Sequence, residues 1–206
     1  RPQFLRSLRD VTTEIGAMLI FDEVQTGVGA TGKMWAHQHA DVEPDIIAVG
    51  KKMQICGIMA SDSAKQFEDN PFETSSRINS TWGGNLIDMY RSARQLEIIK
   101  RDNLVDNAAK RGVELLSGLN DLASSFDFIS SVRASGTLAA FTLPNTELRN
   151  EMRDNILEGG AHVLNSGFTS IRLRPSLTLS SDEVDEALSI FETAAKKLQG
   201  KEQVRM

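Results

Sequence analysis

The sequence predicts an α/β protein: a first part built on a parallel sheet, followed by a smaller α+β part. Two short apolar runs, AMLIFD (17–22) and EPDIIAVG (43–50), are typical of strands buried on both faces. Between them lie a glycine-rich loop and a short predicted helix at 35–40. A strand, a crossover and a second strand favour parallel pairing, with ligands at the carboxyl ends of the strands.

The later elements follow from apolar periodicity and turn residues. In chain order they are helices at 85–99 and 104–122, a strand at 135–144, a helix at 146–157, and strands at 161–167 and 170–179. The first of these helices carries an apolar stripe of Leu86, Met89, Tyr90, Ala93 and Leu96. A capping-box sequence at 180–183 begins a last helix, which we expect to end at Gly200. We place a domain boundary near residue 100, giving domains at 1–100 and 101–206.

Composition narrows the class of protein. A chain of 206 residues that is 40% hydrophobic and 25% charged can form a real core, as soluble globular proteins do. The net charge of −5 argues against a nucleic-acid partner. The single cysteine, Cys56, excludes an internal disulfide and fits a reducing, cytoplasmic compartment. No apolar run approaches the roughly 18 residues of a membrane span, so we expect no membrane partner. The chain starts with RPQFLRSLRD, without methionine and within a helix pattern, so we expect a piece of a longer protein.

Asp22 and Glu23 follow the first apolar run directly, where burial makes a negative charge costly. A carboxylate at such a place is expected to face a cation. Magnesium is the first candidate, because GVGATGKM resembles the phosphate loop of an ATPase. However, Met34 replaces the metal-binding hydroxyl residue, and the loop follows the acids instead of preceding them. The ATPase interpretation is therefore the weakest.

The second candidate is a protonated ring nitrogen, such as that of pyridoxal phosphate. At about 4 Å and an effective dielectric near 20, the pair is worth roughly 4 kcal/mol, or about three pKa units. This chemistry also needs an amine for a Schiff base, and AVGKKMQICG places Lys51 and Lys52 just past the second strand. In a third interpretation Asp22 caps a helix or pairs with a lysine, while Lys51 and Lys52 are solvated. The residue pattern alone leaves this third interpretation open.

Four motifs separate these alternatives: LIFDEVQTGVGATGKMWAHQ, DIIAVGKKMQICGIMAS, SRINSTWGGNLIDM and SIRLRPSLTL. In one register from about residue 15 to 190, they resemble the class III pyridoxal-phosphate aminotransferases. The resemblance implies fold type I: the C-terminal half of a large parallel-sheet domain followed by a small C-terminal α+β domain. It also implies a homodimer with shared active sites. Within the family, the motifs are most similar to those of enzymes acting on the ε-amino group of L-lysine. The alternative donor is 4-aminobutyrate or another ω-amino acid.

The resemblance implies roles for the residues after the first strand. Asp22 would pair with the pyridinium nitrogen of the cofactor. Val24 would lie against the ring, although plain core packing is an equal alternative. Gln25 would lie near the phenolic oxygen and the substrate. Glu23 would point to the opposite face of the strand, so we assign it no cofactor role.

Two adjacent lysines compete for the Schiff base. The family lysine is followed four or five residues later by a glycine pair. Aligning Cys56-Gly57 with that pair selects Lys52 as the catalytic lysine and leaves Lys51 as a solvated or structural charge.

The resemblance also implies residues for phosphate and substrate. Thr81 would hold the cofactor phosphate of the neighbouring subunit. Asn79 and Ser80 would line the substrate channel, with a surface turn nearly as plausible. Arg172 would grip the α-carboxylate of the substrate through two parallel hydrogen bonds, and Arg174 on the same strand face is the fallback. An interdomain salt bridge is the alternative role for Arg172.

The implied reaction belongs to lysine degradation. It transfers the ε-amino group of lysine to 2-oxoglutarate and gives 2-aminoadipate 6-semialdehyde and glutamate. Further family site residues belong upstream of this chain, so we expect the segment alone to be inactive. A non-catalytic protein with this fold is a remaining alternative. The three histidines show no metal-ligand spacing, so no metal site is predicted.

Overall fold

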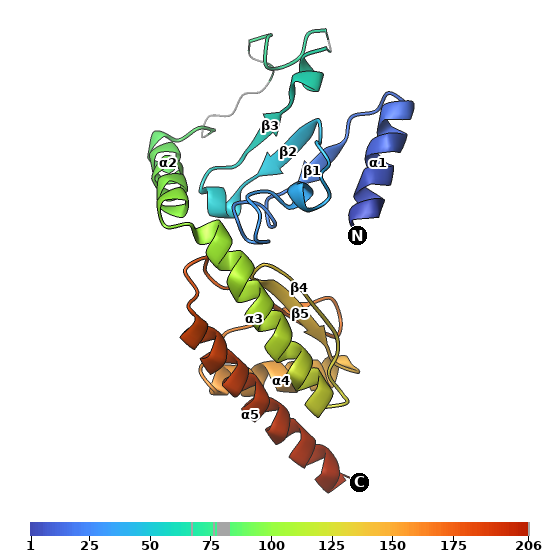
Figure 1. Ribbon diagram of the computed structural model, residues 1–206, viewed down its shortest axis with the longest axis vertical. Helices are drawn as coiled ribbons and strands as arrows, with labels where there is room; N and C mark the ends of the chain where they lie inside the picture. The colour runs from blue at the N-terminus through green and yellow to red at the C-terminus, as the bar shows by residue number, and fades with distance from the viewer. Residues whose placement is uncertain (67, 76, 78–82, 206) are drawn as a thin grey trace. The chain divides into compact units, whose positions relative to one another are not determined.

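The computed structural model describes residues 1–66, 68–75, 77 and 83–205, and Figure 1 shows their elements in chain order. The chain divides into two compact units. The first unit comprises Arg1–Gly29 and Lys33–Asn103, and the second comprises Ala30–Gly32 and Leu104–Met206. A three-residue piece of the loop between the first two strands therefore belongs to the second unit.

The first unit is built on a three-stranded sheet with the order β1-β2-β3. Its elements are α1 (Pro2–Glu14), β1 (Ile20–Asp22), η1 (Ala36–His39), β2 (Ile46–Val49), η2 (Lys51–Met53), β3 (Gly57–Ala60), η3 (Asp62–Gln66) and α2 (Leu86–Arg101). The parallel pairing of β1 with β2 is confirmed, with Asp22 opposite Ala48. The sequence did not predict β3, which pairs antiparallel with β2.

Burial on both faces of β1 was a wrong expectation. Ile20 is 58% exposed, and the buried apolar residue of this run is Leu19, just before the strand. Leu19 clusters with Ala40 and Val42, and Leu5 and Leu8 of α1 pack against that cluster. Only one side of the run is thus covered by apolar side chains within the described part of the chain.

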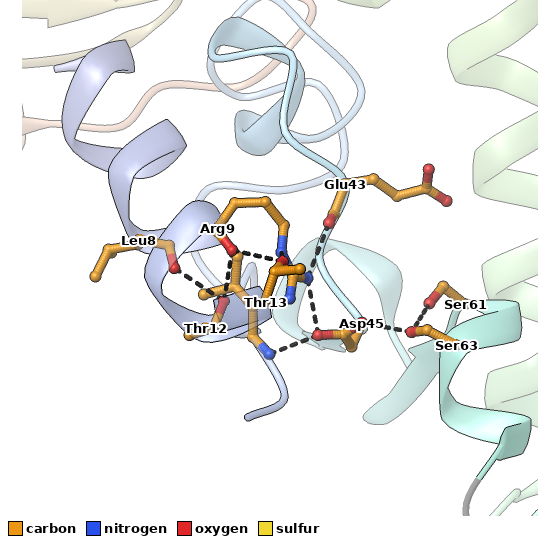
Figure 2. A network of polar contacts seen from close by, with 9 residues as sticks. Leu8, Arg9, Thr12, Thr13, Glu43, Asp45, Ser61 and Ser63 are labelled. Carbon is orange, nitrogen blue, oxygen red and sulfur yellow. Dashed lines mark hydrogen bonds and ion pairs between the residues drawn. The ribbon is translucent and has the colours of Figure 1, made fainter. Parts of the chain in front are cut away.

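A buried carboxylate, Asp45, joins the elements of the first unit (Figure 2). Its Oδ2 accepts hydrogen bonds from Arg9 Nη1 at 2.8 Å and from the Leu19 backbone N–H at 2.7 Å, while Ser63 Oγ donates to Oδ1. Burial alone would raise the pKa of Asp45, but the hydrogen bonds from Ser63, Leu19 and Arg9 and the Arg9 charge lower it below the ordinary value. One side chain therefore ties α1 and η3 to the starts of both parallel strands.

The second unit packs helices on a four-stranded antiparallel sheet with the order β4-β5-β7-β6. Its elements are α3 (Leu104–Ser125), β4 (Ser130–Ser135), β5 (Leu138–Thr142), α4 (Thr146–Glu158), β6 (Leu164–Ser166), β7 (Ser170–Leu173) and α5 (Ser181–Arg205). The core combines residues of all three helices and of β5 and β7, including Leu119, Leu122, Phe141, Met152, Ile156, Ile171, Phe191 and Leu198. The sequence did not predict β4, and the predicted strand at 135–144 started too early for β5, because the turn at Gly136 was not recognised.

The helix predictions hold with two corrections, and one strand prediction needs a third. The apolar stripe of α2 is exposed, with Leu86 at 82% and Tyr90 at 76%, so in this structure it does not face a core. Helix α5 continues through Gly200 to Arg205, because one helical glycine costs about 1 kcal/mol and does not break a long helix. Strand β7 ends at Leu173, so the predicted strand at 170–179 was too long.

The capping box at the start of α5 is confirmed. Glu183 accepts a hydrogen bond from the Ser180 N–H at 2.7 Å, and its own N–H donates to Ser180 Oγ at 3.2 Å. The hydrogen bond from the Ser180 backbone lowers the pKa of Glu183. In the described part of the chain, no helix combines the length and apolar character that a membrane span requires.

Candidate active site

The carboxyl ends of β1 and β2 lie at one edge of the first sheet because the two strands are parallel. Asp22 is the last residue of β1, and the pairing continues one residue further, where the Glu23 N–H donates to the Ala48 carbonyl at 2.9 Å. Strand β2 ends at Val49, and after one intervening residue, Gly50, Lys51 and Lys52 open the η2 turn. The fold thus brings Asp22 and the lysine pair to the same edge.

The two acids at the end of β1 have different environments. Asp22 is exposed, and its Oδ1 accepts the Val24 N–H at 2.9 Å. Glu23 is only 3% exposed; its Oε1 accepts the His37 N–H at 2.8 Å, and its Oε2 accepts the Thr26 hydroxyl. We expected Asp22 to be buried, but Glu23 is the buried acid. The chain turns after β1, and the loop that follows covers Glu23. Glu23 anchors this loop, and Asp22 presents its carboxylate at the edge.

The lysine turn is compact and lies against the loop after β1. A Cβ placed on Gly50 would lie 3.2 Å from Cys56 Sγ and 3.4 Å from Val24 Cγ1. Val24 therefore approaches the chain immediately before the lysines. The turn is closed by hydrogen bonds from the Met53 N–H to the Gly50 carbonyl at 3.0 Å and from the Gln54 N–H to the Lys51 carbonyl at 2.9 Å.

The two lysines are distinct in conformation and burial. Lys51 has a φ of 46°, a left-handed conformation that costs a residue with a Cβ about 1–2 kcal/mol, and its side chain is exposed. Lys52 is half-buried, and its Nζ atom is buried. Strained backbone of this kind is found preferentially at functional sites. The turn therefore presents an exposed lysine and a lysine with a buried amine at the same sheet edge as Asp22.

The glycines of the loop that resembles a phosphate loop serve close packing. A Cβ on Gly27 would lie 2.5 Å from Cζ3 of the Trp35 ring, and one on Gly32 would lie 3.0 Å from the Ala109 Cα. These positions are filled by the chain's own atoms and leave no room for a phosphate. The geometry thus argues against the ATPase interpretation.

Arg172 lies in the middle of β7 in the second unit, paired with Ala140 of β5 and Leu164 of β6. It is half-buried and lines a pocket of about 260 Å³ in that unit, together with His162, Arg174 and Glu183. Arg174 is exposed and lies one residue beyond the end of β7, but it lines the same pocket as Arg172 and remains the fallback. Arg172 has the regular strand position, and Arg174 does not.

The remaining predicted residues fall in two groups. Gln25 is half-buried in the loop between Asp22 and the glycines. Asn79, Ser80 and Thr81 lie outside the described residues. Sequence reasoning missed the anchoring role of Glu23, although a hydroxyl residue three positions later, Thr26, was an available signal for it.

Comparison with known proteins agrees with the resemblance in the sequence. The family model for class III aminotransferases matches residues 1–195. The L-lysine-epsilon aminotransferase of Mycobacterium tuberculosis is 44% identical over 195 residues, covering 94% of this chain and 43% of the relative. The mitochondrial 4-aminobutyrate aminotransferase of Sus scrofa is 38% identical over 192 residues, covering 91% of this chain and 37% of the relative.

A solved structure shows the same fold. The lysine aminotransferase from M. tuberculosis in the internal aldimine form matches with a TM-score of 0.93 and 43% identity, covering 96% of this chain and 46% of that chain. The chain thus spans less than half the length of the relatives that it matches. With a family model that covers nearly all of its residues, the chain belongs to the class III aminotransferases, which are pyridoxal-phosphate enzymes of fold type I.

Proposed function

We propose that the full-length protein transfers the ε-amino group of L-lysine to 2-oxoglutarate, giving 2-aminoadipate 6-semialdehyde and glutamate. The observation that carries this proposal is the shared edge of β1 and β2, where an exposed carboxylate and two lysines follow neighbouring parallel strands. An acid and an amine at one sheet edge are the pair that pyridoxal phosphate requires.

The chemistry of the residues at this edge fits the cofactor. The exposed Asp22 carboxylate suits a protonated ring nitrogen, and a lysine amine suits the aldehyde carbon. Val24 offers an apolar surface for the ring, and the Gln25 amide can donate to the phenolic oxygen. When bound, the cofactor supplies an electron sink for the carbanion formed at the carbon that carries the amino group.

The chain's own residues then have three tasks. Asp22 keeps the ring nitrogen protonated through its negative charge. The lysine amine would remove a proton from the ε-carbon of the substrate and, as a general acid, return it to the cofactor carbon that had carried the aldehyde. Arg172 holds a substrate carboxylate through two parallel hydrogen bonds, which matters most for 2-oxoglutarate and for the α-carboxylate of lysine.

The choice between the two lysines has evidence on each side. The spacing to Cys56-Gly57 predicts Lys52 as the catalytic lysine. Lys51 is the second candidate, because its exposed side chain and left-handed backbone mark it as the accessible, strained residue of the turn. The Nζ atom of Lys52 is buried.

Borohydride reduction of the full-length protein with bound cofactor, followed by peptide mapping, distinguishes the candidates. A phosphopyridoxyl label on Lys52 would support the prediction from spacing, and a label on Lys51 would support the prediction from geometry. A label on neither would overturn the proposed site. Lys33 is a suitable internal control, because it is an ordinary lysine that follows the packed glycines.

Similarity to relatives supports L-lysine as the amino donor. Identity is 44% to the mycobacterial lysine enzyme and 38% to the mammalian 4-aminobutyrate enzyme. Glutamate production by the full-length protein should therefore be fastest with lysine when lysine, ornithine and 4-aminobutyrate are compared at equal concentration. A clear preference for 4-aminobutyrate would overturn the donor and leave the class intact.

We also propose a homodimer in which Thr81 holds the cofactor phosphate of the partner subunit, while Asn79 and Ser80 line the substrate channel. A hydroxyl flanked by backbone N–H groups is a suitable phosphate-binding set. Mixing an inactive Thr81→Ala protein with one lacking both Lys51 and Lys52 should restore part of the activity, since one mixed site would be intact. No recovery in mixtures that sedimentation shows to exchange subunits would contradict sharing.

A further inference from the structure

A three-residue segment of the loop after β1 is built into the fold of the second unit. The Ala30 carbonyl accepts hydrogen bonds from the Thr137 N–H at 3.0 Å and from Thr137 Oγ1 at 3.3 Å. Ser135 Oγ donates to the Thr31 carbonyl at 3.4 Å. Ala30 and Thr137 are fully buried, so the two hydrogen bonds between them lie out of contact with water. The β4–β5 turn thus holds the loop tip.

Glycines allow the backbones at this point to approach closely. A Cβ on Gly136 would lie 2.4 Å from the Thr31 carbonyl carbon and 2.5 Å from the Gly32 nitrogen. A Cβ on Gly112 of α3 would lie 2.3 Å from the Gly136 carbonyl oxygen. Ordinary contact begins at 3.4 Å, so a methyl group on Gly136 would displace the loop tip by about 1 Å. The tip has no free space on this side.

The loop is stiff between its tip and the candidate cofactor residues. The Gly29 N–H donates to the Met34 carbonyl at 3.2 Å and closes the base of the tip. The Gly27 N–H donates to the Glu23 carbonyl at 2.9 Å, and the Trp35 ring fills the space beside Gly27. Val24 and Gln25 lie within this hydrogen-bonded stretch. Few rotatable backbone bonds between the tip and these two residues are free of such hydrogen bonds. A displacement of the tip should therefore also move Val24 and Gln25.

We propose that Gly136 and Thr137 are positioning residues that set the placement of Val24 and Gln25 by fixing the tip of their loop at Ala30–Gly32. This inference rests on the proposed function, because it takes Val24 and Gln25 to contact the cofactor.

The primary test compares Gly136→Ala with Gly16→Ala in the full-length protein with bound pyridoxal phosphate. Both glycines have left-handed φ values, 53° and 67°, so alanine introduces similar backbone strain at each. A Cβ on Gly16 meets nothing within 4 Å, whereas one on Gly136 meets the loop tip. We expect Gly136→Ala to lower kcat on the order of 10- to 100-fold, as a displacement of about 1 Å does, and to change the visible circular dichroism of the bound cofactor.

Gly16→Ala should leave kcat and the cofactor signal near the wild-type values. Equal kcat and equal visible circular dichroism in the two variants would overturn the inference. A merely structural role of Gly136 would lower the thermal midpoint without changing the signal of the cofactor that remains bound. That readout separates positioning from stability.

A gentler pair keeps the inference testable if Gly136→Ala does not fold. Thr137→Val removes only the hydroxyl bond to Ala30, while Thr137→Ser keeps it. We expect Thr137→Val to change the visible signal of the cofactor and lower kcat a few-fold, and Thr137→Ser to behave as wild type. An unchanged signal and kcat in Thr137→Val would overturn the role of Thr137. A wild-type protein that neither binds the cofactor nor transaminates would overturn the proposed function and this inference with it.

Discussion

The second unit buries its apolar stripes, whereas the first unit leaves much of its apolar surface exposed. On α3, Leu115 and Leu119 are at most 1% exposed, but on α2 Leu86 and Tyr90 are 82% and 76% exposed. The first unit is instead joined by two buried acids, Glu23 and Asp45, which accept hydrogen bonds from several segments. The comparison shows that periodicity predicts a helix wherever it occurs, but predicts burial only where a partner surface is present.

Truncation of a large apolar side chain should give the largest difference in the free energy of unfolding between the two units. Phe141 is fully buried against Phe191, with ring centroids 6.3 Å apart, so Phe141→Ala should cost about 3–5 kcal/mol. Tyr90→Ala in the first unit should change the free energy of unfolding by no more than about 0.5 kcal/mol. Urea unfolding of the 206-residue chain, followed by circular dichroism, measures both. The exposed Phe168 is the matched control, and a Tyr90 effect as large as that of Phe141 would contradict the comparison.

Arg172 extends the comparison to function, because this predicted substrate-binding residue lies on the well-packed sheet of the second unit. Arg172→Lys keeps the charge but loses the paired hydrogen bonds, so kcat/KM for 2-oxoglutarate in the full-length protein should fall roughly 10- to 100-fold. Arg174→Lys, beyond the strand end, should change it little. Steady-state kinetics with varied 2-oxoglutarate measure both effects. A larger fall in kcat/KM for Arg174→Lys than for Arg172→Lys would assign carboxylate binding to Arg174.

Glu23 tests whether polar anchors hold the first unit. Glu23→Ala leaves the part-buried His37 N–H and the Thr26 hydroxyl without their acceptor, so it should cost about 1–3 kcal/mol. Glu23→Gln keeps an acceptor oxygen and should cost less than about 1 kcal/mol. Thermal unfolding followed by tryptophan fluorescence reports this unit, since Trp35 lies in the anchored loop. Equal losses in the two variants would show that the hydrogen bonds are not what Glu23 contributes.

Asp45 should make the stability of the first unit depend on pH. Its pKa is lowered in the folded chain, so its stabilising contribution is present above the unfolded value, about 4, and is lost as the pH falls through the folded value. Asp45→Asn should therefore cost about 1–2 kcal/mol at pH 7 and progressively less below about pH 4. Unfolding midpoints of both proteins between pH 3 and pH 7 give the difference. A cost that does not vary with pH would rule out this linkage.

The sequence was informative where local chemistry decides the structure. The parallel pair at 17–22 and 43–50, the helices of the second unit and the capping box at Ser180 all follow from patterns within a few residues. The placement of Asp22 and the lysines at one edge follows from strand direction alone. These features needed no knowledge of distant contacts.

The rest depends on contacts between distant residues. Which of Asp22 and Glu23 is buried depends on His37, 14 residues after Glu23, and the role of Gly136 depends on Ala30, more than 100 residues earlier. The glycines at 27 and 32 suggested phosphate binding, because the same lack of a Cβ serves both a ligand and a neighbouring backbone. Periodicity and spacing do not indicate whether a ligand or a neighbouring backbone fills the space beside a glycine.

The central claim, that Asp22 faces the ring nitrogen of a cofactor held by the lysine turn, has a direct measurement. Full-length protein should be loaded with pyridoxal phosphate labelled with ¹⁵N at the ring, and the nitrogen chemical shift recorded near neutral pH in wild type and in Asp22→Asn. The account predicts a protonated nitrogen in wild type and an unprotonated one in the variant. The same protonation state in both proteins would contradict it.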